Sequence, residues 1–342
     1  MTRAASSFSG PWTVIGAGGW GTALAIVLAR QGLEVRLWAR RPETAAVLAA
    51  SRENSVYLPG VRLPANVAPG SDLPGALRGA AAVLLAAPSA HTRPLLDAMA
   101  AYLTPATPLI SATKGLEEPS LMRMSEVAND VLRPHFARPL RHAVLSGPTF
   151  AREVARGEPA AVVIASADAA LAAVVQAAFS SPVLRLYTSN DVAGVELGAA
   201  VKNVIAIAAG LCDGLGLGAN TRAALIARGL AEMARLAEAC GGRRETLSGL
   251  AGLGDLVLTC TGDLSRNRTV GLELGRGQRL ADILSSRPTV AEGVTTCAAT
   301  VRLAARHGVE MPITEQIHAV LFQQRAPREA VRVLMERSLK AE

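Results

Sequence analysis

One lysine in this sequence stands where a lysine is unusual. The stretch 192–211, VAGVELGAAVKNVIAIAAGL, holds only two ionisable side chains, Glu196 and Lys202. Helical spacing places small and apolar residues three and four positions from Lys202 on the same face. A lysine in such surroundings has either a perturbed pKa or a dedicated anionic partner, and it can donate or accept a proton. We therefore predict a functional lysine, with a buried structural ion pair as the alternative.

A second lysine follows an apolar, strand-like run. Lys114 stands in SATKG, directly after residues 108–111. Loops at the carboxyl ends of parallel strands border the ligand crevice, so Lys114 is placed to meet an anionic or carbonyl oxygen. An ordinary surface lysine is the alternative. The turn SGPTFA, residues 146–151, also follows a strand and opens a helix, whose free backbone donors suit a ligand. It is equally compatible with a plain strand-to-helix connection.

Two further polar groups lie in or beside apolar runs. Asp255 ends GLAGLGD, where it either orients an ammonium group or a substrate hydroxyl or caps the helix that follows. Residues 265–268, SRNR, open another helical stretch. A hydroxyl, a guanidinium, an amide and helix N-terminal N–H groups form a phosphate cradle that needs no metal. The alternative for SRNR is an exposed polar cap.

These side chains need a scaffold, and its first element is readable near the N-terminus. Gly16, Gly18 and Gly21 form G-x-G-x-x-G between WTVI, residues 12–15, and an Ala/Leu-rich helical stretch, residues 22–30. In this context the glycines provide a tight turn, close backbone approach to a pyrophosphate, and close helix packing. A targeting or membrane segment is the alternative for this uncharged run. Mid-helix glycines argue against it, since each costs roughly 1 kcal/mol relative to Ala.

The end of the next strand bears on which dinucleotide binds. An NAD-specific site usually places an acidic residue there, about twenty residues after the glycines. This sequence has Ala39 followed by Arg40 and Arg41. Two guanidinium groups suit a 2′-phosphate, so NADP(H) is favoured and NAD(H) stays open. The alternative is a pair of solvated arginines before a loop.

The order of elements predicts two domains in this chain of 342 residues. Strand-like runs at 81–86, 108–111, 142–146, 160–165 and 183–187 alternate with helical stretches such as 90–101, 120–132 and 167–179. This alternation is typical of an α/β fold with a mainly parallel sheet and helices on both faces. From about residue 190 helical patterns dominate. We predict a dinucleotide-binding domain over 1–190 and an all-helical substrate domain over 191–342.

Composition narrows the partners. The net charge is +7, yet the basic residues are mostly single arginines or pairs interleaved with acids, so an anionic small substrate is favoured over nucleic acid. The four cysteines are far apart and fit neither a disulfide framework nor a metal site, which indicates reduced, cytosolic thiols. The five histidines lack metal spacing as well. We expect no metal and no integral membrane segment.

With these motifs in view, the chain closely resembles bacterial NAD(P)-dependent glycerol-3-phosphate dehydrogenase. The resemblance runs from about Trp12 to Met335 and is carried by GAGGWGTALA, SATKGLE, SGPTFA, ELGAAVKNVIAIAAG, AGLGDLVLTC and SRNR. It implies a Rossmann-type N-terminal domain, a helical C-terminal domain that also dimerises, and a cytoplasmic homodimer. The implied reaction reduces dihydroxyacetone phosphate to sn-glycerol 3-phosphate for glycerophospholipid synthesis. The rivals are a two-domain reductase of hydroxy or keto acids and a non-catalytic NADP(H)-sensing regulator.

The resemblance also assigns roles at matching positions. It gives the proton donor and acceptor as Lys202, assisted by Lys114 and Asp255. Cofactor contacts, beyond the glycine turn, fall on Gly19, Trp20, Arg40, Arg41, Lys114, Ala151, Arg266, Val290 and Glu292. Substrate contacts fall on Lys114, Gly147, Thr149, Lys202, Asp255, Ser265, Arg266 and Asn267. Gly19 departs from the family, in which Ser is frequent at this position, so a hydroxyl contact to phosphate is lost while the backbone donor stays.

Overall fold

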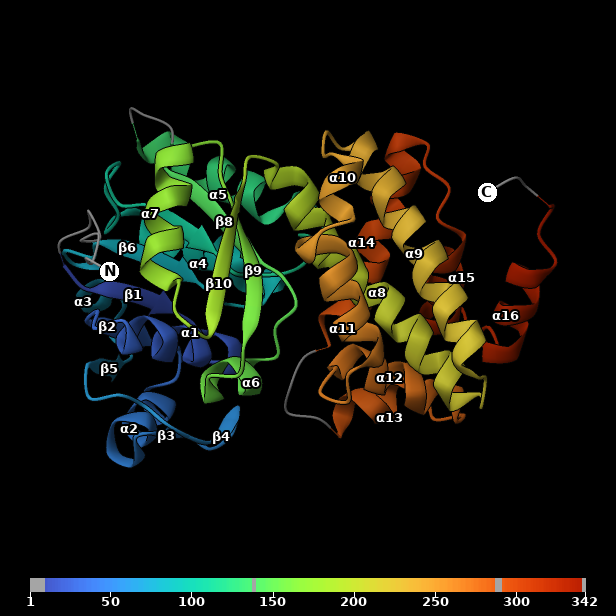
Figure 1. Cartoon of the computed structure of the whole chain (residues 1–342), viewed down its shortest axis with the longest axis horizontal. Helices are drawn as coiled ribbons and strands as arrows, with labels where there is room; N and C mark the ends of the chain where they lie inside the picture. Colours follow the sequence, from blue (N-terminus) through green and yellow to red (C-terminus); the bar gives the residue numbers. More distant parts are fainter. Residues whose placement is uncertain (1–9, 137–139, 287–290, 340–342) are drawn as a thin grey trace. The chain divides into compact units, whose positions relative to one another are not determined.

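The computed structural model describes residues 10–136, 140–286 and 291–339 and divides into two compact units (Figure 1). Unit 1 comprises Met1–Thr113 and Met124–Val192, and unit 2 comprises Lys114–Arg123 and Ala193–Glu342. The chain therefore passes from one unit to the other at three places. The sequence-based division at residue 190 assigned the segment Lys114–Arg123 to the first domain.

Unit 1 is built on one eight-stranded sheet with the order β10-β9-β8-β7-β6-β1-β2-β5. All neighbouring strands pair in parallel except β8 and β9, which are antiparallel. The predicted mainly parallel α/β fold is confirmed. The strands are β1 (Trp12–Ile15), β2 (Val35–Trp38), β5 (Val67–Gly70), β6 (Ala82–Leu85), β7 (Leu109–Ser111), β8 (His142–Ser146), β9 (Ala160–Ala165) and β10 (Leu184–Ser189).

The helices of unit 1 fall into two groups that each pack together (Figure 1). One group contains α1 (Gly19–Arg30), α6 (Ala151–Arg156) and α7 (Ala169–Phe179). The other contains α3 (Leu73–Leu77), α4 (Thr92–Ala100) and α5 (Met124–Leu132). The central strands β1 and β6 are buried along their whole length, as parallel strands covered on both faces are. Trp12 packs edge-on against Phe179 within this core, with ring centroids 5.7 Å apart.

Several elements of unit 1 differ from the sequence-based expectation. The strand β5, the helix α2 (Pro42–Ser51) and the hairpin of β3 (Glu53–Asn54) and β4 (Leu58–Arg62) were not predicted. The strands β4 and β5 carry Pro and Gly in place of a long apolar run. The helix expected from residue 120 begins at Met124 instead. Before it, Leu116 and Arg123 form an antiparallel bridge, and Leu121 between them has a positive φ of 64°. This backbone conformation is incompatible with a right-handed helix, so the segment forms a tight turn instead.

Unit 2 is helical, as predicted, and surrounds one long helix, α8 (Val192–Gly214) (Figure 1). Every α8 residue from Gly194 to Cys212 is buried. Within the described part of the chain α8 is the one helix long and apolar enough to cross a membrane, and here it forms the centre of the core. The other helices are α9 (Ala219–Ala239), α10 (Arg244–Leu247), α11 (Asp255–Thr261), α12 (Arg266–Gly275), α13 (Leu280–Ser285), α14 (Glu292–His307), α15 (Pro312–Phe322) and α16 (Pro327–Met335).

A buried carboxylate on α9 completes the start of α15. Glu232, which is 2% exposed, accepts hydrogen bonds from the backbone N–H groups of Ile313 and Thr314 at 2.6 and 3.2 Å, and from the Thr314 hydroxyl at 3.2 Å. The first N–H groups of a helix have no intrahelical partner, so this side chain supplies what the helix lacks. Burial raises the pKa of Glu232 to about 7, and the hydrogen bonds oppose part of that rise.

We predict that Glu232→Ala destabilises unit 2. The substitution leaves two buried backbone donors unpaired, at about 1–3 kcal/mol each. Urea unfolding followed by far-UV circular dichroism measures the loss. Glu315→Ala is the matched control, because this carboxylate lies in the first turn of α15 without those contacts and should change stability by no more than about 0.5 kcal/mol. Equal midpoints for the two variants would contradict the capping role.

Candidate active site

The two lysines singled out by the sequence meet at one carboxylate in unit 2. Lys202 donates from Nζ to Oδ1 of Asp255 at 2.8 Å, and Lys114 donates from Nζ to Oδ2 at 2.7 Å. The three side chains are 6%, 15% and 1% exposed, in the order Lys202, Lys114, Asp255. The sequence holds only one more lysine, Lys340. Two ammonium groups thus share one carboxylate away from water, and the trio carries a net positive charge.

A hydroxyl that the sequence analysis missed completes the contacts of Lys202. Thr259 accepts a hydrogen bond from Lys202 Nζ at 2.6 Å and donates its own hydrogen to the backbone carbonyl of Asp255 at 2.6 Å. Thr259 stands four positions after Asp255, so one turn of α11 places both on the same face. That spacing was the available signal. The hydroxyl holds the ammonium from a second side and fixes its direction.

The pKa of Lys202 records the competing influences on this amine. Together they lower it from the ordinary value of 10.5 to about 8. Burial is the largest cause, the positive charge of Lys114 also lowers the pKa, and the Asp255 carboxylate opposes both. An amine with a pKa close to the working pH populates both protonation states, which is the condition for acid and base catalysis.

The local fold explains why Asp255 is available to the lysines. A short π-helical turn, Leu250–Gly254, leads directly into α11, whose first residue is Asp255. Gly252 packs against the backbone of Leu247, where a Cβ would collide, so the chain can make this tight passage. The carboxylate contacts the two lysines instead of capping α11, so the capping alternative for Asp255 is wrong.

Lys114 is held by the segment that carries it. Leu116 and Leu121 pack into the core of unit 2, and Arg123 pairs with the buried carboxylate of Glu196 on α8 at 3.1 Å. Arg302 on α14 donates to the backbone carbonyl of Glu118 at 3.1 Å. These contacts fix the segment Lys114–Arg123 on α8, which carries Lys202, and on α14, so the spacing of the two amines is set within one unit.

The predicted phosphate cradle lies at the start of α12. Ser265 caps the helix by accepting from the Arg268 N–H at 3.2 Å. Asn267 is buried, donates to Asn203 Oδ1 at 2.9 Å and accepts from the Gly293 N–H at 3.0 Å. Arg266 is exposed. Of the three predicted phosphate ligands, Arg266 is therefore the one whose side chain reaches outward.

Glu292, at the start of α14, belongs to the same electrostatic neighbourhood. Burial raises the pKa of its carboxyl, and the positive charges of Arg266, Lys114 and Lys202 oppose the rise. The family resemblance implies a cofactor contact for this residue. The neighbouring Val290, which had the same assignment, lies outside the described residues.

In unit 1 the glycine turn has the shape that a pyrophosphate site requires. Gly16 has φ of 112°, and a Cβ on it would lie 2.7 Å from the carbonyl oxygen of Ala86. Gly21 packs against the Gly16 carbonyl, whereas a Cβ at Gly18 would meet nothing within 4 Å. The backbone at Gly18 is thus open to a ligand at the N-terminus of α1. The buried indole N–H of Trp20 has no hydrogen-bond partner within the described structure, so it too is suited to a ligand.

The turn is held by a residue that the sequence analysis did not identify. Asn54 is 3% exposed and donates to the Ala17 carbonyl at 3.0 Å and to the Thr22 hydroxyl at 2.8 Å. The same side chain accepts from the Tyr57 N–H at 3.2 Å, and the Tyr57 carbonyl lies against Gly19. The hairpin β3–β4 therefore supports the glycine turn from outside the G-x-G-x-x-G pattern.

The remaining predicted residues of unit 1 lie at strand ends. Arg40 and Arg41 are exposed after β2, and Arg41 donates to the Tyr57 hydroxyl at 3.4 Å. Gly147 and Thr149 follow β8, and the Thr149 hydroxyl donates to the Gly147 carbonyl at 3.2 Å. Ala151 begins α6 beside Gly19. These positions line the carboxyl-terminal edge of the parallel strands, where open α/β sheets bind ligands.

Comparison with known proteins agrees with this geometry over nearly the whole chain. Models of the N-terminal and C-terminal parts of NAD-dependent glycerol-3-phosphate dehydrogenase match residues 11–172 and 191–332. This chain belongs to that family. It is 56% identical over 326 residues to glycerol-3-phosphate dehydrogenase [NAD(P)+] of Koribacter versatilis, covering 95% of this chain and 96% of the relative.

Two further relatives support the assignment. The enzyme of the same name from Geobacter metallireducens is 54% identical, covering 96% of this chain and 98% of the relative. The crystal structure of glycerol-3-phosphate dehydrogenase from Coxiella burnetii superposes with a TM-score of 0.92 at 40% identity, covering 96% of this chain and 100% of that one. The predicted family is confirmed.

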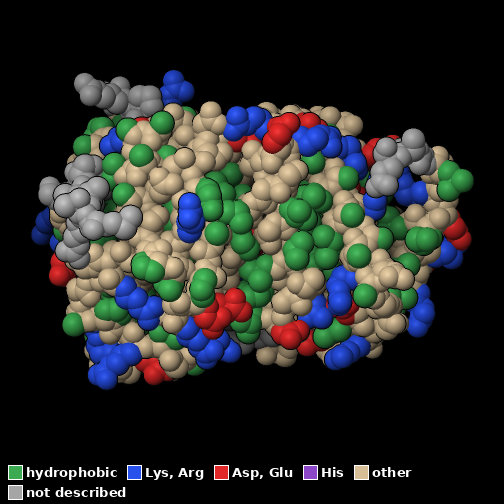
Figure 2. Space-filling view, viewed as in Figure 1, with side chains coloured by type: hydrophobic (Ala, Val, Ile, Leu, Met, Phe, Trp, Pro, Cys, Tyr) green, Lys and Arg blue, Asp and Glu red, His purple; other side chains and the backbone are tan. Residues whose placement is uncertain are grey.

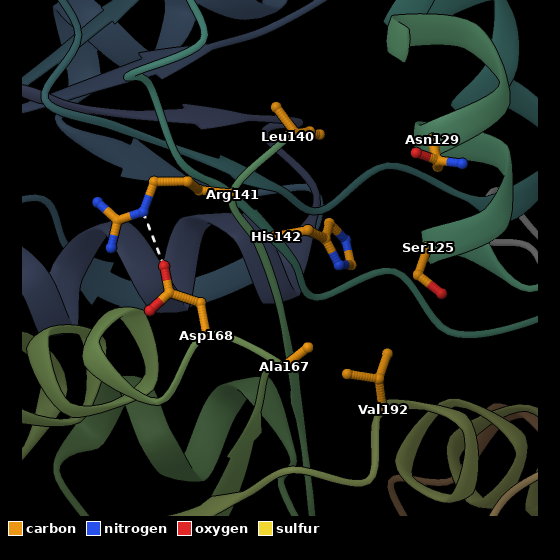
Figure 3. Close-up of a pocket in the computed structure, with 8 residues that line it drawn as sticks. All are labelled: Ser125, Asn129, Leu140, Arg141, His142, Ala167, Asp168 and Val192. Carbon is orange, nitrogen blue, oxygen red and sulfur yellow. Dashed lines mark hydrogen bonds and ion pairs between the residues drawn. The ribbon is translucent and has the colours of Figure 1, made fainter. Parts of the chain in front are cut away.

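Other surface features of this family member lie apart from the predicted residues. Unit 1 contains a cavity of about 460 Å³ whose lining includes the His142 ring. The Arg141–Asp168 ion pair, with 2.8 Å between nitrogen and oxygen, lies on one side of it (Figure 3). None of its lining residues is a predicted site residue.

On the face shown in Figure 2, basic and acidic side chains are interspersed. Among the described residues no group of three or more His, Cys, Asp and Glu side chains could hold a metal ion.

We predict that Lys202 titrates near pH 8 and that Asp255→Asn lowers its pKa further, because the carboxylate stabilises the ammonium form. With only three lysines in the chain, NMR of protein labelled with ¹³C at lysine Cε resolves each amine. Lys114→Arg and Lys340→Arg assign the resonances. A Lys202 amine that titrates at the ordinary value of 10.5 would show that it is not shielded from water.

Proposed function

We propose that the protein interconverts dihydroxyacetone phosphate and sn-glycerol 3-phosphate with a nicotinamide cofactor. The observation that carries the proposal is the buried carboxylate of Asp255 holding both Lys202 and Lys114. The reaction needs a proton donor at a ketone oxygen and positive charge to stabilise the developing alkoxide. This trio supplies both without a metal.

In the reduction, the Lys202 ammonium protonates the oxygen that becomes the hydroxyl, and in the oxidation its amine removes that proton. Bound reduced nicotinamide supplies the hydride. Lys114 adds positive charge beside the same oxygen, which stabilises negative charge as it develops. Asp255 and Thr259 orient the Lys202 amine through their contacts at 2.8 and 2.6 Å. A pKa of about 8 leaves both forms of this amine populated near neutral pH.

The residues of unit 1 fit the cofactor. The open backbone at Gly18 and the N-terminus of α1 would hold the pyrophosphate, and the Trp20 indole would donate to the bound nucleotide. The exposed guanidinium groups of Arg40 and Arg41 would hold the 2′-phosphate of NADP(H). NADP(H) is therefore the proposed cofactor, and NAD(H) is the alternative cofactor for the same site.

The proposed phosphate site is the start of α12. Arg266 supplies charge, Ser265 a hydroxyl donor, and α12 its N-terminal N–H groups, while Asn267 supports the turn from beneath. Gly147 and Thr149 of unit 1, Ala151 and Glu292 complete the proposed contacts to substrate and cofactor. We further propose a cytoplasmic homodimer whose product enters glycerophospholipid synthesis, as the family resemblance implies.

We predict that Lys202→Met lowers kcat for dihydroxyacetone phosphate by about 10²- to 10⁴-fold, the usual contribution of a positioned general acid. Met fills the buried volume, so folding should be retained. Purified wild-type and variant proteins are compared at 340 nm with NADPH and with NADH, and nicotinamide fluorescence reports cofactor binding, which should change little. Near-normal turnover by the variant would remove Lys202 from the chemistry.

The same assay separates the alternative functions. A reductase of hydroxy or keto acids would prefer an unphosphorylated keto acid over dihydroxyacetone phosphate. A regulator that senses NADP(H) would bind NADPH without oxidising it. Oxidation that depends on dihydroxyacetone phosphate excludes both.

We predict that Arg266→Ala raises KM for dihydroxyacetone phosphate by about ten- to a hundredfold, the effect of losing a charge-assisted hydrogen bond. Arg276→Ala is the matched control, because this exposed arginine stands at the opposite end of α12. Steady-state kinetics at fixed NADPH measures both variants. Unchanged kinetics for Arg266→Ala would mean that the phosphate binds elsewhere.

A further inference from the structure

The first turn of α12 points three consecutive side chains in three directions. Successive residues of a helix are about 100° apart, so Arg266, Asn267 and Arg268 cannot share a face. Asn267 is directed inward, to Asn203 and the Gly293 N–H. Arg268 is directed toward the end of α8. The direction left to Arg266 is outward, and it depends on how the other two are held.

Arg268 is tied to two carboxylates. Its Nε and Nη2 donate to Oδ2 of Asp213 at 2.9 and 2.8 Å, and its Nη1 donates to Asp263 Oδ1 at 3.0 Å. Asp213, 11% exposed, lies near the end of α8, while Asp263 lies in the loop before α12. Ion pairs with several hydrogen bonds to one planar guanidinium fix orientation as well as distance. Arg268 thus joins α8, the loop and α12.

The two helices also touch backbone to backbone. A Cβ at Gly210 would collide with the Arg268 carbonyl, and one at Gly214 would collide with the Leu272 carbonyl. On the opposite side, Gly271 and Gly275 meet the carbonyls of Ile207 and Leu211. Paired glycines one turn apart on each helix bring the two axes close together. This packing limits the separation of the two helices, and the contacts of Asn267 and the Arg268–Asp213 pair add side-chain restraints at the first turn of α12.

We propose that Arg268 is a positioning residue for phosphate recognition: through Asp213 it fixes the rotation of α12 on α8, and so the spacing between Arg266 and Lys202. The inference rests on the proposed function, since it assigns the substrate phosphate to the start of α12. Arg268 itself does not touch the substrate. It makes the enzyme selective for a substrate whose phosphate lies at one distance from the reacting carbon.

The test compares Arg268→Met with Arg222→Met. Arg222 pairs with the same carboxylate, Asp213 Oδ1, at 2.9 Å, but it stands on α9 and does not hold α12. Arg268→Met should lower kcat/KM for dihydroxyacetone phosphate by about 10- to 100-fold, mainly through KM, because small displacements of a positioning group are costly. Turnover of unphosphorylated dihydroxyacetone should change by less than about twofold, since no phosphate contact is lost. Inhibition by inorganic phosphate should weaken, and Arg222→Met should leave all three readouts near wild type.

Two outcomes would overturn the inference. Equal losses with both substrates would mean that Arg268 only supports the fold, and no loss with either would mean that the glycine and Asn267 contacts position α12 without Arg268. If Arg268→Met does not fold, Arg268→Lys and Asp213→Asn are measured in the same way, with thermal unfolding as the check. Both should raise KM for the phosphorylated substrate selectively. Arg268→Lys should raise KM by less than Arg268→Met, because the positive charge remains. Failure of the wild-type protein to reduce dihydroxyacetone phosphate would instead refute the proposed function.

Discussion

One carboxylate serving two ammonium groups is the constraint on which the rest of unit 2 depends. Removing charges from water is costly, and a single Asp255 offsets only part of the cost of burying Lys202 and Lys114. The trio is stable because the Thr259 hydroxyl adds a hydrogen bond and because the surrounding helices are already packed. The positive charge of the two lysines is what a developing oxyanion would meet. Burying two ammonium groups beside one carboxylate thus lowers the stability of the fold and also supplies the positive charge that the proposed reaction needs.

Small residues allow this arrangement. The chain has 3% aromatic residues, and α8 is built mainly from Ala, Gly, Val and Ile. Such residues let helix backbones approach closely, as at Gly210 and Gly271, or at Gly198 against the Ala251 carbonyl. Close, interdigitated interiors leave little freedom for displacement. A lysine on such a helix therefore has a defined position, which a long side chain on a mobile surface lacks.

The sequence predicted the family, the mainly parallel sheet and the helical second half, because long apolar runs and the glycine turn have clear periodicities. It singled out Lys202 for the same reason, as a charge in an apolar helix. It offered Asp255 as a residue that could orient an ammonium group, but it left helix capping open, since nothing local joins positions 53 residues apart. Asn54 was missed because a single polar residue carries no pattern until the fold brings it to the glycine turn. The only local signal for Thr259 was its spacing of four residues from Asp255, and the SRNR motif contained Arg268 without indicating its partner Asp213. The strand β5 and the β3–β4 hairpin were missed because Gly and Pro interrupt their apolar residues.

The segment Lys114–Arg123 has a consequence for biosynthesis. It is translated with unit 1, but its anchoring partners, Glu196 on α8 and Asp255, come later, and Asp255 is 141 residues beyond Lys114. At about 5–20 residues per second the ribosome takes on the order of ten seconds to make that length. During that interval Leu116 and Leu121 of the nascent chain have no unit 2 core to pack against. The segment Lys114–Arg123 can therefore reach its final position only after the second half of the chain has been synthesised. Neither half synthesised alone contains both Lys114 and Lys202.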